Sequence, residues 1–276
     1  KIARIQQFNA NKKLKNSITG LVGLGYDSNV LNSPDSSDQG TATNVASPRL
    51  MTLGSYQRRF KYELDHEFSA KLTSLYMYSL DDDAATADPF LLTAQLPYSY
   101  KSKLFNKGYK LTLSPGYESL FMDVQGSGTR DQILSSFMLN INNMFIMSPN
   151  WQSQYTLDIR QDDSLLSATT TADNADALKY SLKTTQYYFL SKNKKTAVTG
   201  GLGYILNDAT GENKAYNRID LSLGYMSYFK DWDTSYNLNL TTYNLSYGGA
   251  NSRDEKNYSL TMTFNKPIKD WFIASS

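Results

Sequence analysis

The chain has no cysteine, one histidine and no apolar run approaching the ~18 residues of a membrane-spanning helix. The lack of cysteine excludes a disulfide framework and any thiolate metal site. An excess of one charge is also missing, since 28 basic and 26 acidic residues are scattered along 276 positions and no basic tract indicates nucleic-acid binding. The glycine-rich segments 20–25 and 198–204 lack the helix start and Lys-Ser/Thr of a nucleotide loop, so we expect no cofactor and no metal.

The chain does contain many aromatic residues, with 21 tyrosines and 12 phenylalanines, and persistent alternation of apolar and polar residues. Between residues 215 and 264, three segments place an apolar residue at every second position: 219–225, 236–240 and 258–264. Because strand side chains point to opposite faces with period 2, each segment predicts a strand with one apolar and one polar face. Alternation without long apolar runs is typical of a transmembrane β-barrel; a water-soluble barrel or sandwich is the alternative.

The same pattern predicts twelve antiparallel strands, followed after residue 270 by the start of a thirteenth. Bacterial barrels have even strand counts, so either twelve strands close and a tail follows, or the native barrel has fourteen strands; we expect fourteen. Residues 1–16 are expected to form a periplasmic arm or short helix, and residues 17–276 the transmembrane barrel. The twelve strands are predicted near residues 17–30, 48–62, 67–80, 90–101, 109–122, 131–145, 151–162, 176–190, 195–207, 215–229, 234–246 and 256–266.

The connections alternate between long polar loops and short charged turns. The loops 31–47, 81–89, 123–130, 163–175, 208–214 and 247–255 are rich in Ser, Thr, Asp, Asn and Gly, whereas 63–66, 191–194, 230–233 and 266–270 are short. The connections 102–108 and 146–150 belong to the second series but are less regular. This asymmetry is expected of outer-membrane barrels, with short periplasmic turns and longer outer loops. The sequence therefore predicts location in a bacterial outer membrane, with the lipid bilayer and lipopolysaccharide as surroundings.

All three tryptophans fall at the short-turn end. Amphipathic rings prefer the membrane–water boundary, so they predict an aromatic girdle there. The residues of this girdle are Trp151, Trp232, Trp271, Tyr98, Tyr100, Tyr109 and Tyr228.

If the apolar face meets lipid, the polar face lines the lumen, because a charged side chain at the lipid midplane costs ~2–4 kcal/mol. The charged residues assigned to the lumen are Lys71, Lys110, Glu118, Asp158, Arg160, Lys179, Lys183, Arg218 and Asp220. Their basic excess favours anions in a hydrated lumen. The alternative is a network of ion pairs that plugs the barrel.

Three residues depart from the strand pattern. Arg58 shares the face of Tyr56 and Phe60, which a β-bulge or snorkelling to the headgroups would reconcile. Pro97 and Pro115 fall nearly opposite each other on adjacent strands. Because proline donates no ladder hydrogen bond, they predict a local break in the pairing.

Residues 23–30 (Gly-Leu-Gly-Tyr-Asp-Ser-Asn-Val), followed by a polar loop, resemble the first strand of several outer-membrane barrel families. These include the surface lipoprotein assembly modifiers and related barrels linked to periplasmic helical repeats. The turns Lys230-Asp231-Trp232 and Lys269-Asp270-Trp271 are similar to theirs as well. The resemblance implies an outer-membrane barrel with a role in export.

A catalytic or metal-binding role has little support in the sequence. His66, the only histidine, lies in a turn predicted to be periplasmic, away from the outer end where barrel enzymes act. The carboxylate run Asp81–Asp83 lacks the spacing of a calcium loop. We therefore expect a non-enzymatic protein: a pore or export conduit for polar solutes or a secreted polymer, or else a non-conducting barrel that anchors a multiprotein envelope complex.

Overall fold

The computed structural model describes residues 15–27, 47–123, 126–167, 170–248, 254–269 and 272–275. Within these ranges the predicted all-β antiparallel fold is confirmed, with two short 3-10 helices, Asp82–Ala87 (η1) and Thr171–Asp173 (η2). None of the helices in these ranges is long and apolar enough to cross a membrane. The strands are β1 Asn16–Asp27, β2 Ser47–Tyr62, β3 His66–Ser79, β4 Phe90–Gln95, β5 Tyr98–Leu104, β6 Lys107–Met122, β7 Asp131–Ser148, β8 Trp151–Ser164, β9 Ala177–Phe189, β10 Ala197–Ala209, β11 Tyr216–Phe229, β12 Thr234–Tyr247, β13 Asp254–Lys269 and β14 Phe272–Ser275.

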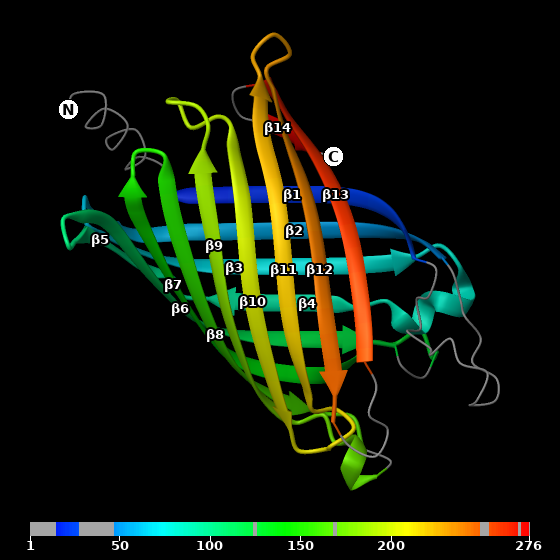
Figure 1. Ribbon diagram of the computed structural model, residues 1–276. Coiled ribbons are helices and arrows are strands. Elements are labelled where there is room, and N and C mark those ends of the chain that lie inside the picture. Colours follow the sequence, from blue (N-terminus) through cyan, green and yellow to red (C-terminus); the bar gives the residue numbers. More distant parts are fainter. Residues whose placement is uncertain are drawn as a thin grey trace.

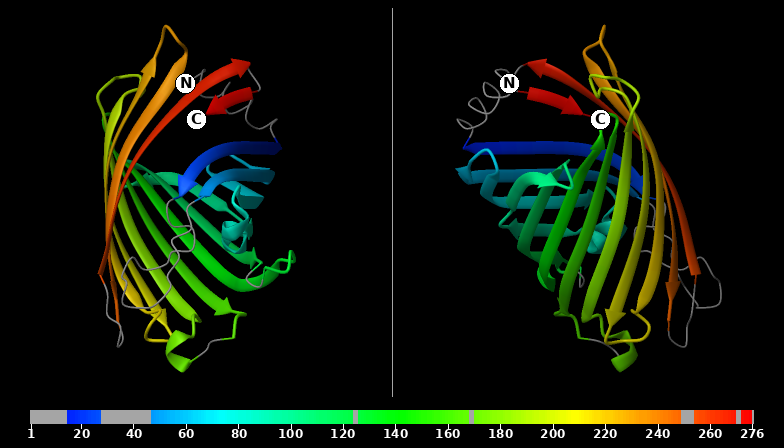
Figure 2. Two further views of the ribbon diagram at one scale, coloured as in Figure 1. Left: turned by 90° about the vertical axis from the view of Figure 1, so that its right-hand side faces the viewer. Right: turned by 60° about the vertical axis from the view of Figure 1, so that its left-hand side comes forward.

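The strands form one sheet in which each lies beside its neighbours in sequence, with β4 and β5 sharing the place between β3 and β6. The sheet twists and curls, so that β1–β3 run at a steep angle to β10–β13 (Figure 1; Figure 2). Over the described residues no ladder joins β1 to β13 or β14, and the sheet stays open where the sequence predicted a closed barrel.

All twelve predicted strands are present. The strand predicted over 90–101 is divided into β4 and β5, and β14 follows at the place expected for the next strand. The predicted N-terminal arm, apart from its last two residues, and the loop 31–46 lie outside the described residues.

The division of this strand occurs at Pro97. Gln95 pairs with Gly116 and Tyr98 with Leu113, so two residues between them are missing from the regular ladder. The Leu96 N–H still donates to the Pro115 carbonyl at 2.9 Å. The predicted break is confirmed where β6 pairs with β4 and β5. It is absent on the other side of β6, which pairs with β7 continuously through Pro115.

The short connections and the long loops occupy opposite ends of the sheet. Phe105 and Asn106 connect β5 to β6 with φ of 49° and 60°, the conformation of a two-residue hairpin turn. The connection expected over 102–108 is therefore tighter than predicted. At the other end the loops include η1 and η2.

The backbone at Gly116, next to the break in the ladder, leaves no room for a side chain, and this predicts an effect on stability. A Cβ there would lie 2.8 Å from the Ala94 carbonyl oxygen, whereas a Cβ at Gly200 would meet nothing within 4 Å. Because the obstacle is backbone, we expect Gly116→Ala to lower the free energy of unfolding by ~1–3 kcal/mol. Urea unfolding followed by tryptophan fluorescence measures it, with Gly200→Ala as the matched control. Equal midpoints for the two variants would contradict the prediction.

Candidate functional site

The sheet has one apolar face with large exposed side chains. On β9 to β13, cross-strand neighbours form rows of aliphatic residues, for example Leu202 beside Leu221 and Leu240 beside Leu260. Leu182, Leu221 and Leu260 are 58%, 52% and 69% exposed. An apolar surface that follows the strand alternation across the sheet indicates contact with a hydrophobic environment.

The opposite face is polar and carries all nine charged residues assigned to the lumen. Strand parity and register place them there: Lys71, Lys110, Glu118, Asp158, Arg160, Lys179, Lys183, Arg218 and Asp220. The structure brings Glu118, Arg160 and Lys179 into one network. Arg218 pairs with Asp220, their Nε and Oδ1 atoms 2.7 Å apart, and Asp158 accepts a hydrogen bond from Asn140 at 2.5 Å. Among the described residues no ion pair involves Lys71, Lys110 or Lys183.

Arg160 is the centre of the network. Its Nη1 reaches Glu118 Oε1 on β6 at 2.5 Å, across the intervening strand β7, and its Nε donates to Asp162. Lys179 on β9 lies 3.6 Å from Asp162 Oδ2. Side chains from non-adjacent strands meet here because those on the concave side of a curved sheet converge, so we assign the polar face to the concave side.

The two carboxylates in this network are buried. Glu118 and Asp162 are only 9% and 8% exposed. Besides Arg160, Glu118 accepts a hydrogen bond from Thr93 Oγ1 at 2.9 Å, and Asp162 accepts one from Ser136 Oγ at 2.6 Å. The arginine and the two hydroxyls together compensate for the desolvation of the carboxylates.

A cluster of lysines occupies the polar face toward the short-turn end. By register it consists of Lys101 and Lys103 on β5 and Lys110 on β6, with Lys101 directly opposite Lys110. Lys71 on β3 lies further along the sheet, since it pairs with Gln95, which in turn pairs with Gly116 on β6. Two acidic residues lie next to this basic cluster: Glu67, which is paired with Arg59 at 2.7 Å, and Asp65, whose backbone carbonyl accepts the Lys101 N–H at 2.7 Å. Like charges directly opposite each other are destabilising, so the cluster maintains a positive potential that an anion would relieve.

The predicted girdle residues divide between the two faces. Trp151, Tyr98, Tyr100 and Tyr109 lie on the apolar face near the short turns, and Trp232 is 70% exposed in the β11–β12 turn. Tyr228 departs from the prediction, because its parity places it on the polar face beside Ser235. Its hydroxyl donates to Asp233, and the Lys195 ammonium lies 3.7 Å from its ring centroid. Trp271 lies outside the described residues.

Other aromatic residues extend this band on the apolar face. The Phe145 ring lies 4.9 Å from Tyr109 and 6.1 Å from Tyr155, and Phe229 stacks on Tyr236 at 4.8 Å. Their alternation was visible in the sequence, but the register was needed to show that they lie side by side.

Arg58 remains on the apolar face, opposite Ala70, with its guanidinium 5.9 Å from the Phe60 ring centroid. The bulge expected there is present, as a register shift between Arg59 and Lys61. Because Arg58 lies four residues from the end of β2, its charge sits near the aromatic band.

The chemically reactive candidates are occupied by structural contacts. His66 Nδ1 lies 2.6 Å from the Tyr98 hydroxyl, on the apolar face. Asp81 Oδ1 accepts the Asp83 N–H at 3.0 Å and caps η1. In the ranges that the structure describes, no group of three or more His, Cys, Asp or Glu residues could hold a metal ion.

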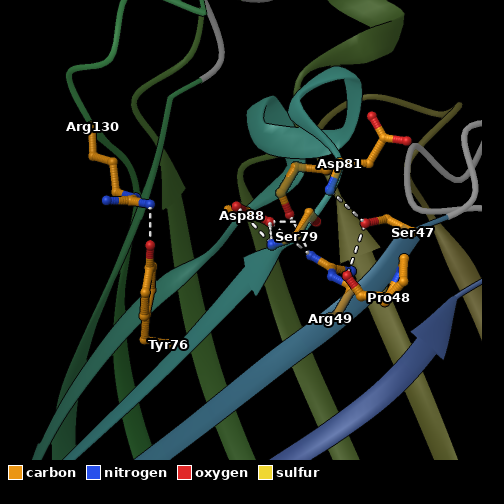
Figure 3. Close-up of polar contacts among 9 residues, drawn as sticks. Ser47, Pro48, Arg49, Tyr76, Ser79, Asp81, Asp88 and Arg130 are labelled. Atoms are coloured by element: carbon orange, nitrogen blue, oxygen red, sulfur yellow. Dashed lines mark hydrogen bonds and ion pairs between the residues drawn. The ribbon is translucent and has the colours of Figure 1, made fainter.

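The carboxylate that organises this loop is Asp88, which the sequence analysis did not identify. It is 1% exposed and accepts hydrogen bonds from the Ser79 N–H at 2.9 Å and the Ser79 hydroxyl at 2.6 Å (Figure 3). Arg49 Nη2 lies 3.6 Å from Asp88 and donates to the Ala87 carbonyl at 2.8 Å. Figure 3 also shows Arg130, whose Nη2 donates a hydrogen bond of 2.7 Å to the Tyr76 hydroxyl. The loop end of β2 and β3 is thereby held by side-chain contacts.

Two further loops contact each other at the same end. The Gly211 N–H donates to the Asn174 carbonyl at 2.9 Å and the Asn213 N–H to the Ala172 carbonyl at 3.0 Å. Asp173 accepts hydrogen bonds from Asn213 Nδ2 at 3.0 Å and from the Thr170 hydroxyl at 2.7 Å. The connections after β8 and β10 thus form one unit at the loop end.

Comparison with known proteins adds no functional assignment: none of the known protein-family models matches the chain, and no curated protein matches it.

Arg160→Met tests the charge network. It leaves the carboxylates of Glu118 and Asp162 without their main partner, so we expect the free energy of unfolding to fall by ~3 kcal/mol. Arg218→Met is the matched control, because this more exposed pair contributes only ~0–1 kcal/mol. Urea unfolding measures both variants. A loss no larger for Arg160→Met than for Arg218→Met would show that the network does not hold the strands.

The loop unit generates a pH prediction. The hydrogen bonds from Asn213 and Thr170 hold the pKa of Asp173 below its usual value. A depressed pKa stabilises the folded loops above the unfolded-state pKa of ~3.9, and this contribution disappears as the pH falls through the folded-state value. Amide-exchange protection of Gly211 and Asn213 should therefore decrease below pH ~4. Asp173→Asn should remove this pH dependence, and unchanged dependence in that variant would contradict the assignment.

Proposed function

We propose that this chain is a bacterial outer-membrane β-barrel that acts as a pore or export conduit for polar solutes or a secreted polymer. The observation that supports this most is the separation of the two faces. One face offers a continuous apolar surface between aromatic residues, and the other collects the charged side chains. A bilayer around the sheet and water inside it would satisfy both faces.

In a bilayer the two sheet edges also have to be paired. An unsatisfied backbone group in hydrocarbon costs several kcal/mol, so β1 and the last strand join each other or a further strand in the inserted protein. The chain's resemblance to barrels with a role in export is in line with this proposal.

The basic cluster supports a preference for anions at the short-turn end. Lys101, Lys103 and Lys110 have no ion pair among the described residues, whereas Glu118 and Asp162 are neutralised by Arg160 and Lys179. An anion approaching from the short turns therefore meets three lysines that have no ion-pair partner, and with them a positive potential.

A second function, that of a non-conducting barrel in an envelope complex, is favoured by one observation. The network around Arg160 spans β6 to β9 on the concave side, where it would narrow the interior. Ion pairs of this kind can fill a barrel of this size.

Single-channel recording of the refolded chain in a planar bilayer separates the two functions. For a pore we expect steady openings, with a reversal potential in a salt gradient that indicates anions. The double variant Lys101→Gln/Lys110→Gln should shift this potential toward cations, because two positive charges are removed. Lys107→Gln is the matched control, since this lysine lies on the opposite face of β6 and donates to the Met147 carbonyl at 2.8 Å.

An inserted chain that never opens would overturn the pore and support the structural barrel. Openings without an anion preference, or a preference that the double variant leaves unchanged, would overturn the role of the basic cluster.

A further inference from the structure

The apolar face is hollowed at the break in the ladder beside Pro97. The hollow has a volume of about 530 Å³, within the ~300–1,000 Å³ of ligand pockets. Its floor consists of the small side chains of Ala70 on β3 and Ala94 on β4, together with Pro115 on β6. The Leu96 N–H at the break donates to the Pro115 carbonyl at 2.9 Å, so this group needs no partner from a ligand.

Aromatic rings form the walls of the hollow. Tyr56 on β2 lines it, and the Tyr56 hydroxyl is held by Asn16, whose Oδ1 accepts its hydrogen bond at 2.9 Å. Tyr117 on β6 and Phe137 on β7 line it from the other direction along the sheet, with their ring centroids 5.1 Å apart. Such a hollow suits a hydrocarbon chain, which loses no hydrogen bond on entering it.

A cation lies at the rim of this hollow, on the same face of the sheet. Arg58 is directly opposite Ala70 in the register, and Tyr56, two residues before it, belongs to the wall. The Arg58 guanidinium lies 5.9 Å from the ring centroid of Phe60, which is nearer the β2–β3 turn. The positive charge is therefore on the short-turn side of the hollow.

The charges that neighbour Arg58 in sequence are paired, whereas its own charge is not. Arg59 is paired with Glu67 at 2.7 Å, and Lys61 with Glu63 at 3.4 Å. Over the described ranges no carboxylate forms an ion pair with Arg58, which is exposed. A ligand with a negative charge would compensate it.

We propose that this place binds an anionic glycerophospholipid of the membrane leaflet at the short-turn side. One acyl chain lies in the hollow between Tyr56 and Phe137, and Arg58 binds the headgroup phosphate. The inference rests on the membrane insertion in the proposed function, not on conduction.

The arrangement of the site indicates this occupant. The hollow extends from Arg58 away from the β2–β3 turn, and Arg58 lies four residues from the end of β2, near the aromatic band. An acyl chain and its headgroup would thus point as they do in a bilayer. A guanidinium binds phosphate oxygens in bidentate geometry, and its uncompensated charge favours a headgroup with net negative charge.

Fluorescence quenching by lipids with brominated acyl chains tests the site. The three tryptophans are replaced by phenylalanine, and Phe137→Trp places a single tryptophan in the wall of the hollow. The full chain is reconstituted into phosphatidylcholine vesicles, and brominated phosphatidylglycerol is compared with brominated phosphatidylcholine at equal mole fractions. We expect stronger quenching by phosphatidylglycerol, with a relative affinity about fivefold higher, because Arg58 attracts the anionic headgroup.

A second reporter controls for anionic lipid that gathers around the whole protein. Leu221→Trp in the same tryptophan-free chain lies on the apolar face of β11, at a position that is 52% exposed. The two brominated lipids should quench this tryptophan equally.

Variants of the Phe137→Trp chain separate the two parts of the site. Arg58→Gln should remove the preference for phosphatidylglycerol, whereas Arg59→Gln should keep it, because Arg59 lies on the polar face and is paired with Glu67. Ala94→Leu extends a side chain into the hollow and should also remove the preference. Gly200→Leu should keep it, because it adds the same side chain to the apolar face of β10, where a Cβ meets no atom within 4 Å.

Equal quenching by the two lipids in an inserted Phe137→Trp chain, or an equal preference at the Leu221→Trp reporter, would overturn the site and leave the proposed function standing. A preference that survives Arg58→Gln or Ala94→Leu would do the same. A chain that fails to insert, with both reporters insensitive to brominated lipid, would overturn the site and the proposed function together.

Discussion

Backbone pairing between strands that follow one another in the sequence is the constraint on which the other features depend. Because side chains alternate along a strand, the register decides which residues share a face, and a slip by one residue would exchange the two faces. The register Glu118–Ser136–Asp162, read across β6, β7 and β8, places two carboxylates where Arg160 reaches both. The charge network is thus a consequence of pairing, and it also penalises a slipped register, which would turn Glu118 toward the apolar side.

The features that depend only on the alternation of apolar and polar residues could be predicted from the sequence. Strand positions and the side of each charged residue follow from period 2, and the register places the nine charged residues on one face. That this face lines a lumen stays a prediction. The residues at the ends of strands were harder to assign from the sequence than those in the middle. Asp162 and Lys101 were not among the assigned residues, and both stood at the predicted ends of their strands, 151–162 and 90–101. Tyr228 was assigned by its chemistry, whereas its parity places it on the polar face.

Contacts distant in sequence could not be predicted from a periodic pattern. Asp88 is buried because Ser79 and Arg49, on two other strands, surround its carboxylate, and nothing near Asp88 in the sequence indicates this. The more visible run Asp81–Asp83 is exposed and only caps η1. The neighbours of Arg160 likewise come from β6 and β9. Alternation shows which face a residue occupies but not which strand's residues meet on that face.

The order of strands in the sheet also affects how the chain folds. From β1 to β14 each strand pairs with the strands beside it in sequence, apart from the shared place of β4 and β5. Each pairing therefore joins strands that are close in sequence, and the sheet can grow one strand at a time from any hairpin that forms early. Contacts of this kind have small sequence separation, which favours rapid folding. In the proposed closed barrel, joining β1 to the last strand would be the one step that spans the chain. It would carry the largest loop-closure entropy and should be the slow step in assembly.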